Sequence, residues 1–168
     1  MVFIGDIVGK PGRNSVQLHL AAIRERFSPT WILANAENAA GGAGLTVPIA
    51  HELLGYGLDG LTLGNHIWKQ KGFADQIGGL AGVSRPANLP TACPGKTYLD
   101  LAKEGVSLRV ITLLGRVGME DLRQTCPMAY LRGPFLDLPP ATFTLVEVHA
   151  EATSEKVALG WFLDGQVS

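Results

Sequence analysis

The sequence lacks the features that mark several large classes of protein. Its only two cysteines, Cys93 and Cys126, have neither the C-x-x-C nor the C-x-H spacing, which argues against a zinc ribbon or a redox pair. No apolar run approaches the roughly 18 residues of a membrane span. The short apolar run at the N-terminus is interrupted by Asp6, unlike a signal peptide. We therefore expect a cytoplasmic protein with reduced thiols and no membrane partner.

The chain also lacks an excess of charge of either sign. It has 14 Lys and Arg against 15 Asp and Glu, a net charge of -1, so we expect no strong nucleic-acid-binding surface. Hydrophobic residues make up 46% and charged residues 17%, a composition typical of a folded globular protein. The length of 168 residues fits a single domain, 1–168. A small anionic substrate remains compatible with this charge, because a bound metal ion can attract it locally.

Short apolar segments alternate with helical patterns in the first half of the chain. Buried strands are predicted at 2–5, 31–34 and 61–63, because these apolar runs end at glycine or polar residues. Helices are predicted at 13–27, at 46–56 and, from a weaker pattern, at 70–78, with a turn at 9–12. Thr46 has the character of an N-cap residue, since Pro48 follows in the first turn. This order implies right-handed crossovers and a mainly parallel sheet.

The pattern changes in the second half. A hairpin is predicted from 97–101 and 107–114, a largely irregular segment at 116–140, a strand at 142–148 and a helix at 154–163. Residues 166–168 look like the approach to a further strand. The predicted fold class is α/β, with mainly parallel or mixed sheet layers flanked by helices.

Polar side chains follow the predicted strands where each one ends. They are Asp6 after the first strand, Glu37 and Asn38 after the second, Asn65 and His66 after the third, and His149 after a later one. Ligands of open α/β sheets bind at the carboxyl ends of the strands, so we expect these six side chains to converge. Any one of them alone is more often an ordinary turn or loop residue. Their joint occurrence after four strands favours a functional site.

The chemistry of these residues points to metal ions. Carboxylate and amide oxygens suit hard cations, and imidazole adds affinity for Mn, Fe or Zn. Serine and cysteine have no matching His and Asp partner at these positions, so nucleophilic triad chemistry is a poorer fit. A carboxylate can bridge two metal ions about 4 Å apart, and such pairs carry out in-line displacement at phosphorus. Glu37 is the bridging candidate because its strand is central in the expected order.

Five segments together resemble one family. They are Phe-Ile-Gly-Asp-Ile-Val-Gly-Lys-Pro-Gly-Arg (3–13), Ala-Asn-Ala-Glu-Asn-Ala-Ala-Gly-Gly (34–42), Leu-Gly-Asn-His-Ile-Trp (63–68), Arg-Pro-Ala-Asn (85–88) and His-Ala-Glu-Ala-Thr-Ser-Glu-Lys (149–156). In this order they resemble the YmdB-type bacterial metallophosphoesterases of the calcineurin-like superfamily. The resemblance covers the whole chain and implies a four-layer α/β/β/α fold.

The resemblance also implies an activity and a division of roles. Family members hydrolyse phosphodiesters, including 2′,3′-cyclic nucleotides, with two divalent or transition metal ions such as Fe, Mn or Mg and a metal-bound hydroxide as nucleophile. Carried over by motif, one metal ion would be held by Asp6, Glu37 and Asn38, and the other by Glu37, Asn65 and His149. His66 would be the catalytic general acid near the leaving-group oxygen.

The chain departs from the wider superfamily at three places. The usual Asp-x-His opening reads Asp6-Ile7-Val8, and the usual acidic residue after Gly-Asn-His is Ile67; both features match the YmdB-type branch. The family continues into a Gly-x-His-x-His segment that completes both metal sites, and this sequence stops at Ser168 before it. The expectation is a domain that is incomplete at its C-terminus, with one ligand fewer for each metal ion.

Several alternatives follow from that expectation. The chain is either part of a phosphodiesterase or a catalytically incompetent fragment, and a third reading is a nucleotide- or phosphate-binding module with a partial metal site. A homo-oligomer in which two chains complete one site is also left open. Arg116 follows a predicted strand and is a candidate for substrate binding, against the ordinary alternative of an exposed loop arginine.

Overall fold

The computed structural model describes residues 1–120 and 122–168. Its first half contains β1 (Val2–Ile4), α1 (Gly9–Phe27), β2 (Ile32–Asn35), α2 (Val47–Gly55), β3 (Gly60–Thr62), α3 (Phe73–Gln76), a 3₁₀ turn (Ile77–Gly79) and β4 (Val83–Ser84). Its second half contains β5 (Leu99–Lys103), β6 (Val106–Leu114), α4 (Pro127–Leu131), β7 (Phe143–His149) and α5 (Thr153–Leu163).

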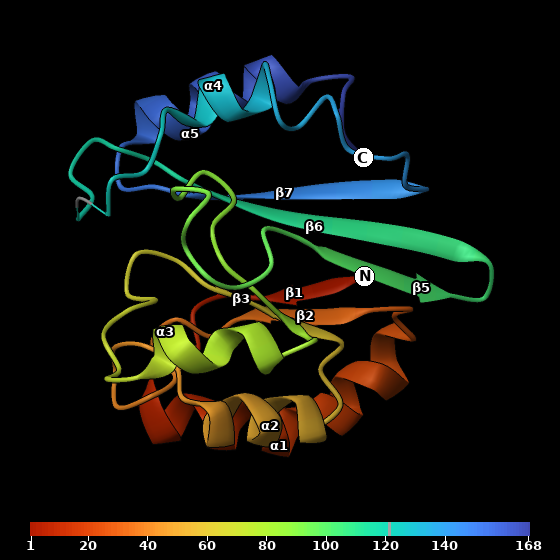
Figure 1. The fold of residues 1–168 in the computed structure, drawn as a ribbon. Helices are drawn as coiled ribbons and strands as arrows, with labels where there is room; N and C mark the ends of the chain where they lie inside the picture. The colour runs from red at the N-terminus through yellow and green to blue at the C-terminus, as the bar shows by residue number, and fades with distance from the viewer. Residues whose placement is uncertain (121) are drawn as a thin grey trace.

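The strands form two sheets. The first sheet has the order β1-β2-β3-β4 with every pair parallel, and the second has the order β5-β6-β7. In the second sheet β5 and β6 are antiparallel while β6 and β7 are parallel. Helices α1, α2 and α3 lie on the outer side of the first sheet, and α4 and α5 lie on the outer side of the second (Figure 1).

Three apolar clusters hold these layers together. Leu53 and Leu61 belong to the cluster between the helices and the first sheet. Leu33 and Val110 belong to the cluster between the two sheets, and Ile111 packs with the residues beneath α4 and α5. The two faces of β6 therefore serve different clusters, as expected for a strand buried on both sides. The four-layer α/β/β/α fold expected from the sequence is confirmed.

Local signals in the sequence explain where some elements begin. The Oγ1 atom of Thr46 accepts a hydrogen bond from the backbone N–H of Ile49 at 3.4 Å, so Thr46 is the N-cap of α2 as predicted. The turn of the hairpin contains Glu104 and Gly105, both with positive φ angles (52° and 79°). Two consecutive left-handed residues match the right-handed twist of the strands in a tight hairpin.

Four expectations need correction. The predicted turn at 9–12 is the first turn of α1, where Pro11 is tolerated because N–H groups in a first turn need no partner within the helix. The predicted helix at 70–78 contains only a short α-helix followed by a 3₁₀ turn. Strand β4 has only two residues and was not predicted. The segment expected to be irregular contains α4, and residue 121 of that segment lies outside the described residues.

The final residues run beside β7. The backbone N–H of Ser168 donates to the carbonyl of Thr144 at 3.0 Å, and the Ser168 hydroxyl accepts from the Thr144 N–H at 3.2 Å. None of the helices in the described residues is both long enough and apolar enough to span a membrane.

Candidate functional site

The six polar side chains singled out by the sequence lie together, at the carboxyl ends of strands from both sheets. Asp6, Glu37, Asn38, Asn65 and His66 lie in the loops that follow β1, β2 and β3, whereas His149 is the last residue of β7. The sequence predicted one shared edge, but the structure builds the site from two facing sheets. Hydrogen bonds and close contacts link the six side chains into one continuous cluster, which we call the strand-end cluster.

Glu37 is the centre of the strand-end cluster and is only 2% exposed. Its Oε1 atom lies 3.2 Å from Nε2 of His149 and 3.5 Å from Nδ1 of His66. Its Oε2 atom accepts a hydrogen bond from the backbone N–H of His66 at 3.1 Å. Burial is the largest influence and by itself raises the pKa of Glu37, but the hydrogen bond and charge of His149 and the His66 amide outweigh it. The pKa is lowered overall, which keeps Glu37 an anion.

His149 is the main partner of this carboxylate. Burial alone lowers the pKa of His149, but the hydrogen bond and charge of Glu37 raise it further than burial lowers it, with smaller contributions from Glu147 and Asp6. The Nε2 atom also lies 2.9 Å from Oδ1 of Asn65. The raised pKa favours the protonated imidazole, which is the form that donates to the Glu37 carboxylate.

Asn38 joins the two remaining side chains. Its Nδ2 atom donates to both carboxylate oxygens of Asp6, each at 3.0 Å, and its Oδ1 atom lies 2.6 Å from Nδ1 of His66. With Oδ1 facing the ring, Nδ1 of His66 is the donor. The imidazole remains partly exposed, with 34% of the side chain accessible.

The loop after β2 is fixed from several directions. The backbone N–H of Gly9 donates to the Asn38 carbonyl at 2.8 Å, and the N–H of Ala36 donates to the Thr62 carbonyl at 2.9 Å. The Arg13 guanidinium donates to the Ala39 carbonyl at 2.6 Å. These bonds connect the loop to α1 and to β3, so the backbone that carries Glu37 and Asn38 is held on both sides.

Gly64 leaves the room that the strand-end cluster needs. A Cβ atom at this position would lie 2.1 Å from Oε2 of Glu37 and 2.5 Å from Cε1 and Nε2 of His149. Real Cβ atoms essentially never approach other atoms this closely. The glycine of the Gly-Asn-His segment is therefore required by steric crowding at the site.

A second polar group, which the sequence analysis missed, lies next to the strand-end cluster. Asn35 at the end of β2 donates to Oε1 of Glu147 at 2.8 Å, and Thr112 of β6 donates to Oε2 of Glu147 at 2.6 Å. Asn35 also accepts a hydrogen bond from the Glu37 backbone N–H at 3.1 Å. These hydrogen bonds connect the two sheets, and the bond from Asn35 holds the backbone of Glu37 in place. The available signal was the alternation of β7, which places Glu147 on the same strand face as His149.

Arg116 lies in the exposed loop after β6. The Glu155 carboxylate at the start of α5 accepts hydrogen bonds from the backbone N–H groups of Arg116, at 3.0 and 3.1 Å, and of Val117, at 3.2 Å. Glu155 therefore fixes the loop, and contact between the Arg116 side chain and a substrate stays a prediction.

The chemistry of the strand-end cluster suits a divalent cation. It offers two carboxylates, two amide oxygens and two imidazoles, which are the donors that Mg, Mn and Fe accept. Among the described residues, no three or more His, Cys, Asp and Glu side chains are grouped so as to hold a metal ion. The amide of Asn38 is hydrogen-bonded to both Asp6 and His66, and the amide oxygen of Asn65 contacts His149. The donor types fit a metal ion, while their present arrangement is one of mutual hydrogen bonding.

Comparison with known proteins shows the family of this chain. The model of the YmdB-like protein family matches residues 2–168. The chain belongs to this family. The resemblance inferred from the five sequence segments is thereby confirmed.

Relatives with a described activity or a solved structure match over the whole chain. The 2′,3′-cyclic-nucleotide 2′-phosphodiesterase of Bacillus subtilis (strain 168) is 40% identical over 171 residues, an alignment that covers 100% of this chain and 63% of the relative. A hypothetical protein from Thermus thermophilus superposes with a TM-score of 0.89 at 41% identity, covering 99% of this chain and 64% of that one. A novel phosphatase from Mycoplasma pneumoniae superposes with a TM-score of 0.90 at 31% identity, covering 99% and 60%. This YmdB-like chain thus spans somewhat less than two thirds of these relatives.

Proposed function

We propose that this YmdB-like chain provides most of the active site of a metal-dependent phosphodiesterase that acts on 2′,3′-cyclic nucleotides or similar small phosphodiesters. The observation that carries the proposal is that hydrogen bonds and close contacts connect all six strand-end side chains, which come from three loops and from the end of β7. The activity for which the Bacillus subtilis relative is named supports the choice of substrate.

The roles are those that the family resemblance implies, and the contacts of Glu37 support its central place among them. Glu37 is central, anionic and buried, so it is the residue that would bridge two metal ions. One ion would be held by Asp6, Glu37 and Asn38, and the other by Glu37, Asn65 and His149. When bound, such ions supply Lewis acidity at the phosphoryl oxygens and lower the pKa of an attacking water toward neutrality.

His66 would be the proton donor to the leaving-group oxygen, the role that the family resemblance implies. Its Nδ1 atom lies 2.6 Å from the side-chain amide oxygen Oδ1 of Asn38, which orients the ring. Because 34% of the side chain is exposed, a substrate can still reach the ring. General acid catalysis by such a group contributes typically about 10²- to 10⁴-fold in rate.

The two cysteines, Cys93 and Cys126, are unpaired, which supports a reducing cytoplasm as the location.

The test is hydrolysis of 2′,3′-cyclic AMP by the purified 168-residue chain with added Mn²⁺, followed by ³¹P NMR, with EDTA as the control. We expect turnover that needs Mn²⁺ and is abolished by Asn65→Ala. Turnover that survives both EDTA and Asn65→Ala would contradict the site assignment.

Thermal melting separates the remaining outcomes. A rise in Tm with Mn²⁺ but no hydrolysis would indicate a binding module with a partial metal site. A folded chain that shows neither hydrolysis nor a Mn²⁺-dependent rise in Tm would refute the metal site in this chain.

A further inference from the structure

A buried cation lies outside the strand-end cluster, in the Arg-Pro-Ala-Asn segment that follows β4. Arg85 is only 3% exposed. One of its Nη atoms donates to the carbonyl of Pro86 at 2.9 Å, and its Nε atom has no acceptor in the described part of the chain. Within that same part of the chain, no Asp or Glu forms an ion pair with it.

An unpaired guanidinium in this position is energetically unfavourable. Burial lowers the pKa of Arg85, with Cys93 and Tyr130 acting weakly in the other direction. Buried charges in folded proteins are normally paired or bound to a ligand of opposite charge. Among the described residues, the guanidinium of Arg85 has a neutral carbonyl oxygen as its acceptor, so most of its donor capacity is unused there.

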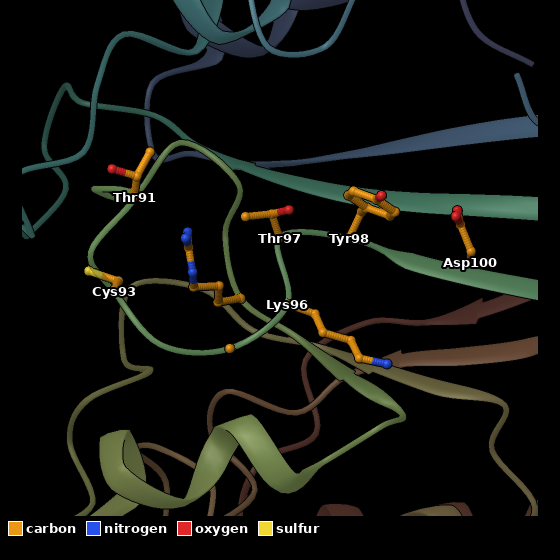
Figure 2. A pocket seen from close by; sticks show the side chains of 8 residues that line it. Thr91, Cys93, Lys96, Thr97, Tyr98 and Asp100 are labelled. Atoms are coloured by element: carbon orange, nitrogen blue, oxygen red, sulfur yellow. The ribbon is translucent and has the colours of Figure 1, made fainter. Parts of the chain in front are cut away.

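Arg85 faces a cavity of about 570 Å³ whose other polar residues are mostly donors. Thr91, Thr97 and Tyr98 contribute hydroxyl groups to its wall (Figure 2). The acidic residue of the wall, Asp100, is neutralised by two hydrogen bonds of 2.8 Å from Arg109. The cavity therefore offers positive charge and hydroxyl groups without a competing free carboxylate.

Lys96, the other basic residue that lines the first cavity, is exposed and lies at its rim. The Nζ atom of Lys96 donates to the Ala81 carbonyl at 3.0 Å, and its side chain points away from Thr91 and Cys93 (Figure 2). The backbone N–H of Arg85 donates to the Lys96 carbonyl at 2.8 Å, which closes the loop between these residues. The closed loop forms the wall of the cavity and fixes Arg85 at its base.

A second cavity adjoins the first and is mainly apolar. Both are lined by Arg85, Thr91 and Thr97, and the second continues to Tyr130 and Leu138. A ligand that fills both would place a charged group at Arg85 and an apolar group against Tyr130 and Leu138. No residue of the strand-end cluster lines either cavity.

We propose that Arg85 is the anion-binding centre of a second ligand site, which takes a small molecule with an oxyanion head and an apolar body. The planar guanidinium matches the two oxygens of a phosphate, phosphonate or carboxylate. The threonine hydroxyls donate to the same head, and the apolar cavity holds the body.

The test uses phenylphosphonate, which has both parts of this ligand and a C–P bond that phosphodiesterases do not hydrolyse. It is added to the ¹⁵N-labelled chain in EDTA, and the Arg85 Nε–H signal is followed by NMR after assignment by its loss in Arg85→Met. We expect a saturable shift of this signal, and weaker binding of inorganic phosphate, which lacks the apolar body. Benzoate shows whether a carboxylate head is also accepted.

Two variants and one control make the result specific. Arg85→Met should weaken binding by about tenfold or more, as for the loss of charge-assisted hydrogen bonds, measured by the ligand-induced rise in Tm. Thr97→Val, which keeps the shape of the cavity, should weaken it several-fold. Arg26→Met removes an exposed cation of α1 and should leave binding unchanged.

Three results would overturn the proposal. One is a non-saturating shift that sodium chloride reproduces at equal ionic strength. Another is an equal loss of binding in Arg85→Met and Arg26→Met. The third is loss of binding in Asn65→Ala, which would place the ligand in the strand-end cluster. Persistence of binding in Asn65→Ala keeps this proposal independent of whether the chain hydrolyses phosphodiesters.

Discussion

Replacement of Gly64 by alanine tests the geometry of the strand-end cluster with a single methyl group. The new Cβ would lie 2.1 Å from Oε2 of Glu37, whereas ordinary contact begins at 3.4 Å. Gly64 is not among the glycines with positive φ, so alanine can adopt its backbone conformation. The effect of the substitution therefore comes from displacement of Glu37 and His149 and not from backbone strain.

The size of that displacement sets the expected effect. To restore ordinary contact, the carboxylate and the backbone of Gly64 must move apart by more than 1 Å. A misplacement of about 1 Å at a reacting centre costs roughly 10²-fold in rate. Overpacking of this kind destabilises a protein by about 1–3 kcal/mol. We expect Gly64→Ala to be folded but to lose about 99% of the Mn²⁺-dependent hydrolysis of 2′,3′-cyclic AMP.

Gly160→Ala is the matched control, because it adds the same methyl group where nothing lies within 4 Å. Gly160 is an exposed residue inside α5, so alanine should stabilise the chain by about 0.5–1 kcal/mol and leave hydrolysis unchanged. Urea denaturation measures the stability of both variants, and the Mn²⁺-induced rise in Tm reports the metal site without relying on turnover. If Gly64→Ala kept wild-type hydrolysis and the full Mn²⁺ response, the crowded arrangement of Glu37 and His149 would be wrong.

Substitutions at three further residues test the site and its surroundings. His66→Ala should lower kcat for 2′,3′-cyclic AMP by about 10²- to 10⁴-fold while keeping the Mn²⁺-induced rise in Tm; loss of that rise would make His66 a metal ligand. Glu147→Leu removes the shared acceptor of Asn35 and Thr112 and should lower the free energy of unfolding by about 1–3 kcal/mol in urea denaturation. Glu147→Gln can still accept a hydrogen bond and should lower it less. An equal loss of stability in both variants would argue against the hydrogen-bonded bridge between the sheets. Glu155→Ala should lower the free energy of unfolding by about 0.5–1.5 kcal/mol and speed hydrogen exchange of the Arg116 and Val117 amides, which Glu155 binds. Unchanged exchange would contradict the role of Glu155 in fixing that loop.

Much of the fold was readable from local patterns. The helix predicted at 13–27, the Thr46 cap of α2 and the hairpin turn, which contains Glu104 and Gly105, each depend on neighbouring residues, and each is found in the structure. The errors have local causes of a different kind. Strand β4 is two residues long, too short for any periodicity, and the turn predicted around Pro11 ignored the tolerance of a first helical turn for proline.

The candidate site was readable in composition but not in its contacts. The positions of Glu37 and Asn65 after strands indicated a shared edge, because the carboxyl ends of parallel strands meet. The sequence also grouped His149 with them, but it did not indicate that His149 reaches Glu37 from a second sheet. Asn35 and Glu147 are 112 residues apart, and nothing local to either predicts their hydrogen bond.

The sequence by itself determined the order of strands and helices and which polar residues follow the strands, because hydrophobic periodicity and turn chemistry act over a few residues. Only the tertiary structure decided how the two sheets face each other, and that packing brings His149 to Glu37 and buries Arg85 beside a cavity. The physical reason is that the protonation of Glu37 and the unpaired charge of Arg85 depend on burial and on distant partners. Those quantities exist only once the layers have packed.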